Sequence, residues 1–126
     1  MNIYLMMVLF QVKHYVADFP LQTPYMLQKG KDGKAWILPL ASHALVHALF
    51  TLVIILIANP RFWYLAALDF FIHAFVDRIK ARYKLKPGTW EAHEKGILLS
   101  KYYRAFGKDQ LAHYLTYSLI MYMMSH

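Results

Sequence analysis

The sequence predicts an all-α protein, a four-helix transmembrane bundle, and three observations carry that prediction. The chain contains four apolar segments, at residues 2–17, 36–58, 62–79 and 106–124. It is 59% hydrophobic and only 17% charged, which is richer in apolar side chains than an average soluble domain. Its basic residues gather in two of the connections between the segments. A chain of 126 residues is expected to form a single domain, residues 1–126.

The lengths of the segments are compatible with membrane insertion. Residues 36–58 are long enough to cross a hydrocarbon core of ~30 Å, which needs about 20 residues. The other three segments are shorter, so they require local thinning of the bilayer or ends seated in the interface. The first segment lacks a basic start and a small-residue cleavage site, so we do not expect a removable signal peptide. A soluble four-helix bundle is the alternative, disfavoured by the few charges on the second and fourth segments.

The charges in the connections predict the topology. Residues 59–61 form a tight turn, whereas connections 19–35 and 81–105 are longer and basic. In a four-span protein these two connections share one face, which the positive-inside rule makes cytoplasmic. The expected location is the bacterial inner membrane with both termini outside, and the net charge of +7 requires no nucleic-acid partner. Residues 89–103 are expected to form a short amphipathic interfacial helix, with Thr89 as its N-cap.

Eight ionisable residues form four pairs, one pair in each apolar segment. A spacing of four residues places both side chains of a pair on one face of an α-helix. In the predicted topology all four pairs lie in the cytoplasmic half of the bundle. Four helices that each offer two imidazole or carboxylate groups indicate a metal site, with two ions. The pairs are His14/Asp18, His43/His47, His73/Asp77 and Asp109/His113.

The ligand types limit the choice of metal. The chain has no cysteine, so any ion is bound through nitrogen and oxygen. Zinc is favoured, and manganese, iron and magnesium stay open. A single pair could equally be a packing histidine or a local Asp–His hydrogen bond. Ionisable groups inside a membrane are costly and usually functional, so four pairs at one depth favour a metal site.

Other residues near the pairs are predicted to support the metal site rather than to bind the metal. Asp69 lies one helical turn before the third pair and is the predicted catalytic proton shuttle. Lys13 and Lys80 are predicted to bind an anionic substrate, with snorkelling to the interface as the alternative for each. Gln11 and Gln22 are predicted to orient ligands through hydrogen bonds.

The four pairs belong to an ordered set of motifs that extends across nearly the whole chain. The motifs are His14-Tyr-Val-Ala-Asp18-Phe-Pro-Leu-Gln22-Thr23, His43-Ala-Leu-Val-His47-Ala, His73-Ala-Phe-Val-Asp77-Arg-Ile-Lys80 and Asp109-Gln110-Leu-Ala-His113. This set resembles a family of small phage and bacterial integral membrane proteins catalogued as a domain of unknown function. The resemblance implies a membrane protein, and the family name gives no activity. More locally, the element with His73 and Asp77 is similar to motifs of membrane-bound metal-dependent hydrolases.

The favoured function is metal-dependent hydrolysis. Two divalent ions would activate a water and polarise a phosphoryl or acyl oxygen. A basic cytoplasmic rim suits an anionic lipid head group or a lipid-linked phosphoester. An oxidative di-iron enzyme is disfavoured, because soluble di-iron bundles use bridging glutamates and the apolar segments contain none.

Two non-enzymatic functions are the alternatives. The metal could be structural, in a protein that binds and modulates another membrane protein of a host or forms a homo-oligomer. A metal or proton transporter would need polar groups through the whole membrane thickness. The outer parts of the segments, residues 2–10, 52–58, 62–68 and 118–124, contain no acidic residue, lysine or histidine, which counts against transport.

Overall fold

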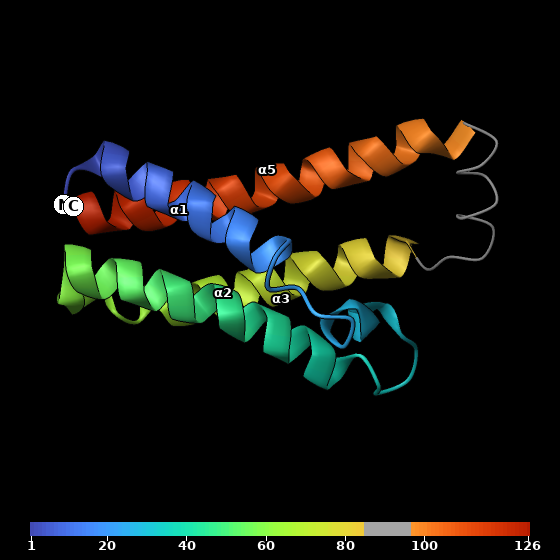
Figure 1. Ribbon diagram of the computed structural model, residues 1–126. Coiled ribbons are helices and arrows are strands. Elements are labelled where there is room, and N and C mark those ends of the chain that lie inside the picture. The colour runs from blue at the N-terminus through green and yellow to red at the C-terminus, as the bar shows by residue number, and fades with distance from the viewer. Residues whose placement is uncertain (85–96) are drawn as a thin grey trace.

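The computed structural model describes residues 1–84 and 97–126, and in these ranges it contains helices and no strand (Figure 1). The prediction of an all-α fold is therefore confirmed. Two short 3₁₀ helices, η1 (Met26–Gly30) and η2 (Pro60–Phe62), lie in the connections. The α-helices are α1 (Ile3–Asp18), α2 (Ile37–Ala58), α3 (Leu65–Lys84) and α5 (Ile97–Ser125).

Local sequence explains several of the helix ends. The Asn2 side chain accepts a hydrogen bond of 2.8 Å from the backbone N–H of Tyr4 and so caps α1. Helix α1 ends at Asp18, two residues before Pro20, which has no backbone N–H with which to continue the helical hydrogen bonds. Asn59 accepts a hydrogen bond from the backbone N–H of Arg61, at 3.2 Å, in the tight turn between α2 and α3.

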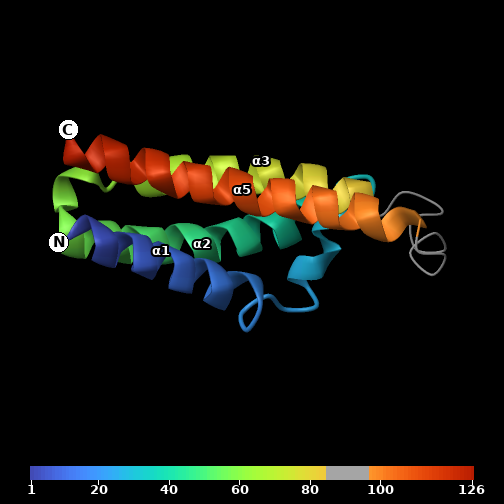
Figure 2. The same ribbon diagram turned by 90° about the horizontal axis from the view of Figure 1, so that it is seen from above.

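The four helices run alternately up and down in a bundle. Helix α1 packs on α2 and α5, and α3 packs on the same two helices (Figures 1 and 2). Both termini lie at the same end of the bundle as the turn between α2 and α3, and η1 lies toward the other end (Figure 1). Corresponding halves of the four helices therefore lie side by side.

The interior consists of an apolar layer followed by a polar one. The apolar layer lies at the end with the termini, where the rings of Phe10 and Tyr117 stack with centroids 5.0 Å apart. Further along each helix the buried side chains become histidine, aspartate and lysine. The members of the apolar layer are Met6, Phe10, Ile54, Ile55, Leu65, Tyr117 and Ile120.

The membrane prediction is supported for only one helix by length and composition. Within the described ranges, Ile37–Ala58 is the helix that qualifies as a span, with a mean hydropathy of 2.3 over its best window. Helix α1 has 16 residues and measures about 24 Å at 1.5 Å per residue, shorter than a hydrocarbon core of ~30 Å. Helices α3 and α5 are continuous, but charged residues interrupt their apolar sequence. The prediction of four spans is therefore not confirmed.

The predicted interfacial helix at residues 89–103 needs a correction. Residues 97–103 belong to α5, which is continuous from Ile97 to Ser125, so they do not form a separate helix. Residues 89–96, including the Thr89 cap, lie outside the described residues.

Candidate metal centre

The eight residues of the four pairs meet in the interior of the bundle, and none is more than 9% exposed. His73, on α3, is the centre of the five imidazoles. Its ring centroid lies 3.6 Å from that of His47, 4.0 Å from His113, 5.3 Å from His43 and 6.4 Å from His14. All four helices therefore contribute to a single polar layer.

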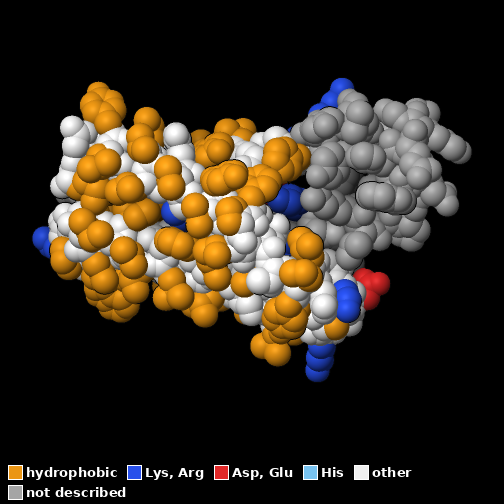
Figure 3. Space-filling view, viewed as in Figure 1, with side chains coloured by type: hydrophobic (Ala, Val, Ile, Leu, Met, Phe, Trp, Pro, Cys, Tyr) orange, Lys and Arg blue, Asp and Glu red, His pale blue; other side chains and the backbone are white. Residues whose placement is uncertain are grey.

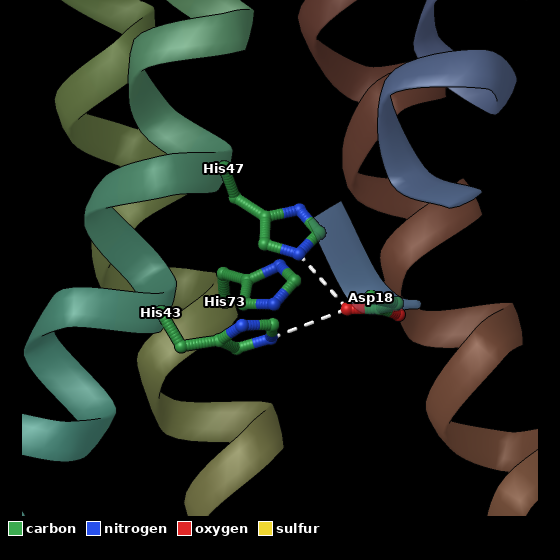
Figure 4. Close-up of side chains that lie close together, drawn as sticks. All are labelled: Asp18, His43, His47 and His73. Carbon is green, nitrogen blue, oxygen red and sulfur yellow. Dashed lines mark hydrogen bonds and ion pairs between the residues drawn. The ribbon is translucent and has the colours of Figure 1, made fainter. Parts of the chain in front are cut away.

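One group of possible ligands combines Asp18 of α1 with His43 and His47 of α2 and His73 of α3 (Figure 4). Each residue offers one atom, and these four atoms lie within 4.8 Å of one another. Asp18 Oδ1 lies 2.9 Å from His47 Nε2 and 3.2 Å from His43 Nε2. Figure 4 shows the three imidazoles on one side of the carboxylate.

A second group contains His73, Asp77 and His113. His113 Nε2 lies 3.3 Å from Asp77 Oδ1 and 3.3 Å from Asp109 Oδ1, so Asp109 extends this group. The other oxygen of Asp77, Oδ2, lies 3.1 Å from His43 Nε2. The Asp77 carboxylate thus connects the two groups.

The distances between these atoms match those around a bound cation. Two ligand atoms that are each ~2.1 Å from one ion are roughly 3.0 to 3.4 Å apart in octahedral or tetrahedral geometry. His43 Nε2 lies at such distances from two carboxylates, yet it lacks the alignment of a hydrogen bond. Both ring nitrogens of His43 and of His73 are buried, and neither residue has a hydrogen-bond partner for them among the described residues. Buried polar atoms are nearly always paired, so the residues fit a divalent ion bound by nitrogen and oxygen.

His14 belongs to the cluster but already has protein partners on both ring nitrogens. Its Nδ1 lies 2.8 Å from the Tyr117 hydroxyl, and its Nε2 lies 2.8 Å from Gln110 Oε1 and 3.0 Å from Asp18 Oδ2. These contacts orient both His14 and Asp18. A polar role for Tyr117 is not among the predictions from sequence, although its position four residues after His113 places it on the same helix face.

Lysine ammonium groups enter the same layer and balance its carboxylates. Lys80 Nζ lies 2.7 Å from Asp109 Oδ2, and Lys29 Nζ lies 2.6 Å from Asp77 Oδ2. Burying an unpaired charge is costly, so each ammonium group is held against a carboxylate. Lys29, on η1, is interpreted from sequence only as one charge of a basic connection. No regular spacing links it to the pairs, so the sequence carries no signal for this contact.

Asp69 and Lys13 form an ion pair next to His47. Asp69 Oδ2 accepts hydrogen bonds from Lys13 Nζ, at 2.8 Å, and from the Thr51 hydroxyl, at 2.6 Å. Lys13 Nζ also donates to the backbone carbonyl of His47, at 3.3 Å, and lies 3.5 Å from its Nδ1. Because these side chains are buried, we assign them to holding His47 in place. The predicted proton transfer by Asp69 and substrate binding by Lys13 stay predictions.

The two predicted glutamines occupy different places. Gln22 donates to the Asp18 carbonyl at 2.9 Å and accepts from Lys29 Nζ at 2.8 Å, so it joins η1 to the end of α1. Gln11 is exposed on α1, and the structure does not bring it to the cluster.

A cavity of about 430 Å³ lies between α3 and α5, beside the second group. Asp109 forms part of its wall together with Lys80, Arg104 and Lys108. Val76 and Ile79 of α3 supply an apolar side. The cluster is therefore adjacent to a space large enough for a small ligand.

The fold and the interior define a helical bundle protein with a buried His/Asp cluster that could hold a metal ion. The chain belongs to the family described as protein of unknown function (DUF3307), whose model matches residues 5–126. No curated protein and no solved structure matches the chain. The resemblance to a domain of unknown function is thus confirmed. The phage origin and the likeness to metal-dependent hydrolases stay predictions.

Proposed function

We propose that this protein is a membrane-embedded hydrolase that uses two divalent metal ions and acts on an anionic lipid head group or a lipid-linked phosphoester. The observation that carries the proposal is the convergence of buried imidazoles and carboxylates at ligand-to-ligand distances, with ring nitrogens left unpaired. Zinc is the favoured ion for a site of histidine and aspartate, and manganese, iron and magnesium are the other candidates.

His73 belongs to both groups of candidate ligands, so a site with two ions needs His73 to be assigned to one of them. A neutral imidazole offers a single lone pair, so one nitrogen of His73 binds one ion. We assign Asp18, His43 and His47 to the first ion. His73, Asp77 and His113 would then hold the second, and Asp109 Oδ1 lies 3.3 Å from His113 Nε2 beside the same group. The Asp77 carboxylate lies between the two groups, 3.1 Å from His43 Nε2 and 3.3 Å from His113 Nε2.

When bound, a pair of divalent ions would supply the Lewis acidity needed to activate water and to polarise a phosphoryl oxygen. The chain's own residues would do the rest. Asp77 sets the separation of the groups, and the Lys29 ammonium compensates its charge. Lys80 holds Asp109 at the wall of the cavity. We propose that substrate reaches the second group from this cavity.

The distribution of apolar surface supports insertion of all four helices into a membrane. Tyr4, Ile57, Phe75 and Leu115, one on each helix, are between 60% and 72% exposed. Hydrophobic side chains cover much of the visible face in Figure 3, and charged side chains there lie mainly toward the end with η1. Large exposed apolar areas are rare on soluble monomers, which favours a lipid environment. The end that carries η1 is then cytoplasmic, and the termini lie outside.

Cysteine labelling tests this topology, since the chain has no native cysteine. In intact cells, a membrane-impermeant maleimide is expected to modify Asn59→Cys, in the turn between α2 and α3. It is expected to leave Lys34→Cys unmodified until the cells are permeabilised. Both positions are exposed, so burial cannot explain a difference. Labelling of both from outside, or the reverse pattern, contradicts the four-span topology.

Hydrolysis is tested on detergent-purified protein with zinc, manganese or magnesium and a panel of phospholipids and lipid-linked phosphates. We expect release of phosphate or of the head group that needs added metal and falls to the uncatalysed background in His73→Ala. His126→Ala is the matched control, because His126 is an exposed histidine outside the cluster. A protein that is loaded with metal and turns over none of these substrates argues against the enzyme.

The second candidate function is structural, and the burial of the ligands favours it. Asp18, His43, His47 and His73 can fill all four positions of a tetrahedral ion, as in closed structural zinc sites. In that case the ion stabilises a small bundle that binds another membrane protein. Metal content without turnover, together with a large loss of thermal stability on chelation, is the expected result for this function.

A further inference from the structure

We propose that the cavity between α3 and α5 is a binding site for a phosphate monoester carried on an apolar chain, a lipid phosphate head group. The inference rests on the proposed function and names the chemistry of its substrate. The cavity is lined by Lys80, Arg104 and Lys108, and its volume of about 430 Å³ is typical of small-ligand sites.

The charge of the lining matches this ligand. The three basic residues and the carboxylate of Asp109 leave a net charge of +2 at the described wall of the cavity. A phosphate monoester carries about −1.5 to −2 at pH 7, so the two charges are complementary. One donor of the Lys80 ammonium is used by Asp109 Oδ2, at 2.7 Å. A lysine has three donors, and among the described residues Asp109 is the hydrogen-bond acceptor of one, so the other two can serve phosphate oxygens.

The cavity also leads toward the candidate metal ligands. Asp109 Oδ1 is buried, has no hydrogen-bond partner in the part of the chain that the structure describes, and lies 3.3 Å from His113 Nε2. The other oxygen of Asp109 faces Lys80, which lines the cavity. A phosphate bound by the three basic residues is therefore adjacent to the second group of ligands, where hydrolysis is proposed.

The apolar side of the cavity favours a lipid over free phosphate. Val76 and Ile79 form this side, and Ile79 is itself 57% exposed on the outer face of α3. Phe75, one helical turn away, is also exposed. An acyl chain attached to the phosphate can follow this face into the surrounding lipid, whereas inorganic phosphate gains nothing from it.

The test is equilibrium binding to the metal-loaded protein in detergent, measured calorimetrically with three probes. These are short-chain phosphatidic acid in a non-hydrolysable phosphonate form, so that turnover adds no heat, phosphatidylcholine with the same chains, and inorganic phosphate. We expect phosphatidic acid to bind more tightly than either of the others. Arg104→Gln and Lys108→Gln should each weaken its binding about tenfold, the loss of one charge-assisted hydrogen bond to phosphate. Lys31→Gln and Lys34→Gln are matched controls, since both lysines are exposed outside the cavity.

The possible outcomes separate this inference from the proposed function. Unchanged binding of phosphatidic acid in both cavity variants, or equal binding of phosphatidylcholine, overturns the site. Inorganic phosphate that binds as tightly as phosphatidic acid overturns the lipid assignment. Binding that depends on Arg104 and Lys108 without any hydrolysis supports the site and contradicts the enzyme. Hydrolysis with an unchanged KM in both variants supports the enzyme and overturns the site.

Discussion

His73→Ala is expected to empty the metal position formed by His73, Asp77 and His113, and so to lower the metal-to-protein ratio of this protein. His73 belongs to both groups of candidate ligands, and its ring is the centre of the five imidazoles. Loss of a residue that only orients a ligand lowers metal affinity by roughly 10- to 100-fold, so loss of a ligand itself should lower the affinity of that position by more than ~100-fold. Elemental analysis of the purified protein gives the metal-to-protein ratio, and competition with a chelator gives the affinity.

Matched controls make this result specific. His126→Ala and Asp32→Asn replace an exposed histidine and an exposed aspartate, so the metal content should stay at the wild-type value. His47→Ala and Asp77→Asn should each reduce it. Circular dichroism and gel filtration separate loss of metal from loss of fold. Full occupancy in folded His73→Ala, His47→Ala and Asp77→Asn would exclude the shared site.

Lys13→Met is expected to reduce the free energy of unfolding by about 3–5 kcal/mol, the usual cost of breaking a buried ion pair. Lys13 and Asp69 are almost fully buried, and their charged atoms lie 2.8 Å apart. Without the ammonium group, the Asp69 carboxylate is left in the interior with the Thr51 hydroxyl as its hydrogen-bond donor. Denaturant titration of the protein in detergent micelles measures the change.

A double variant distinguishes charge pairing from packing. Lys13→Met combined with Asp69→Leu removes both charges, so it should recover most of the stability that Lys13→Met loses. Lys34→Met, at an exposed lysine, should change the unfolding free energy by less than about 0.5 kcal/mol. A double variant as unstable as the sum of its single variants would show that the two side chains contribute independently.

The helices and the composition of the centre could be predicted from sequence because both are local properties. The apolar segments predicted at 2–17 and 36–58 correspond to α1 and α2, whose observed bounds differ by about one residue. The spacing of four residues places each pair on one helix face whatever the rest of the chain does. The up-and-down order of the helices then brings the pairs to one level, where the structure shows them buried together.

Only the tertiary structure decided which atoms face one another. Three contacts depend on how far each helix is rotated about its axis. They are the connection of the two ligand groups by Asp77, the hydrogen bonds at both ring nitrogens of His14, and the ion pair of Asp69 with Lys13. The contact of Lys29 with Asp77 depends on the path of the connection after α1. Helix rotation and loop path result from packing between segments distant in sequence, and a local spacing carries no information about either.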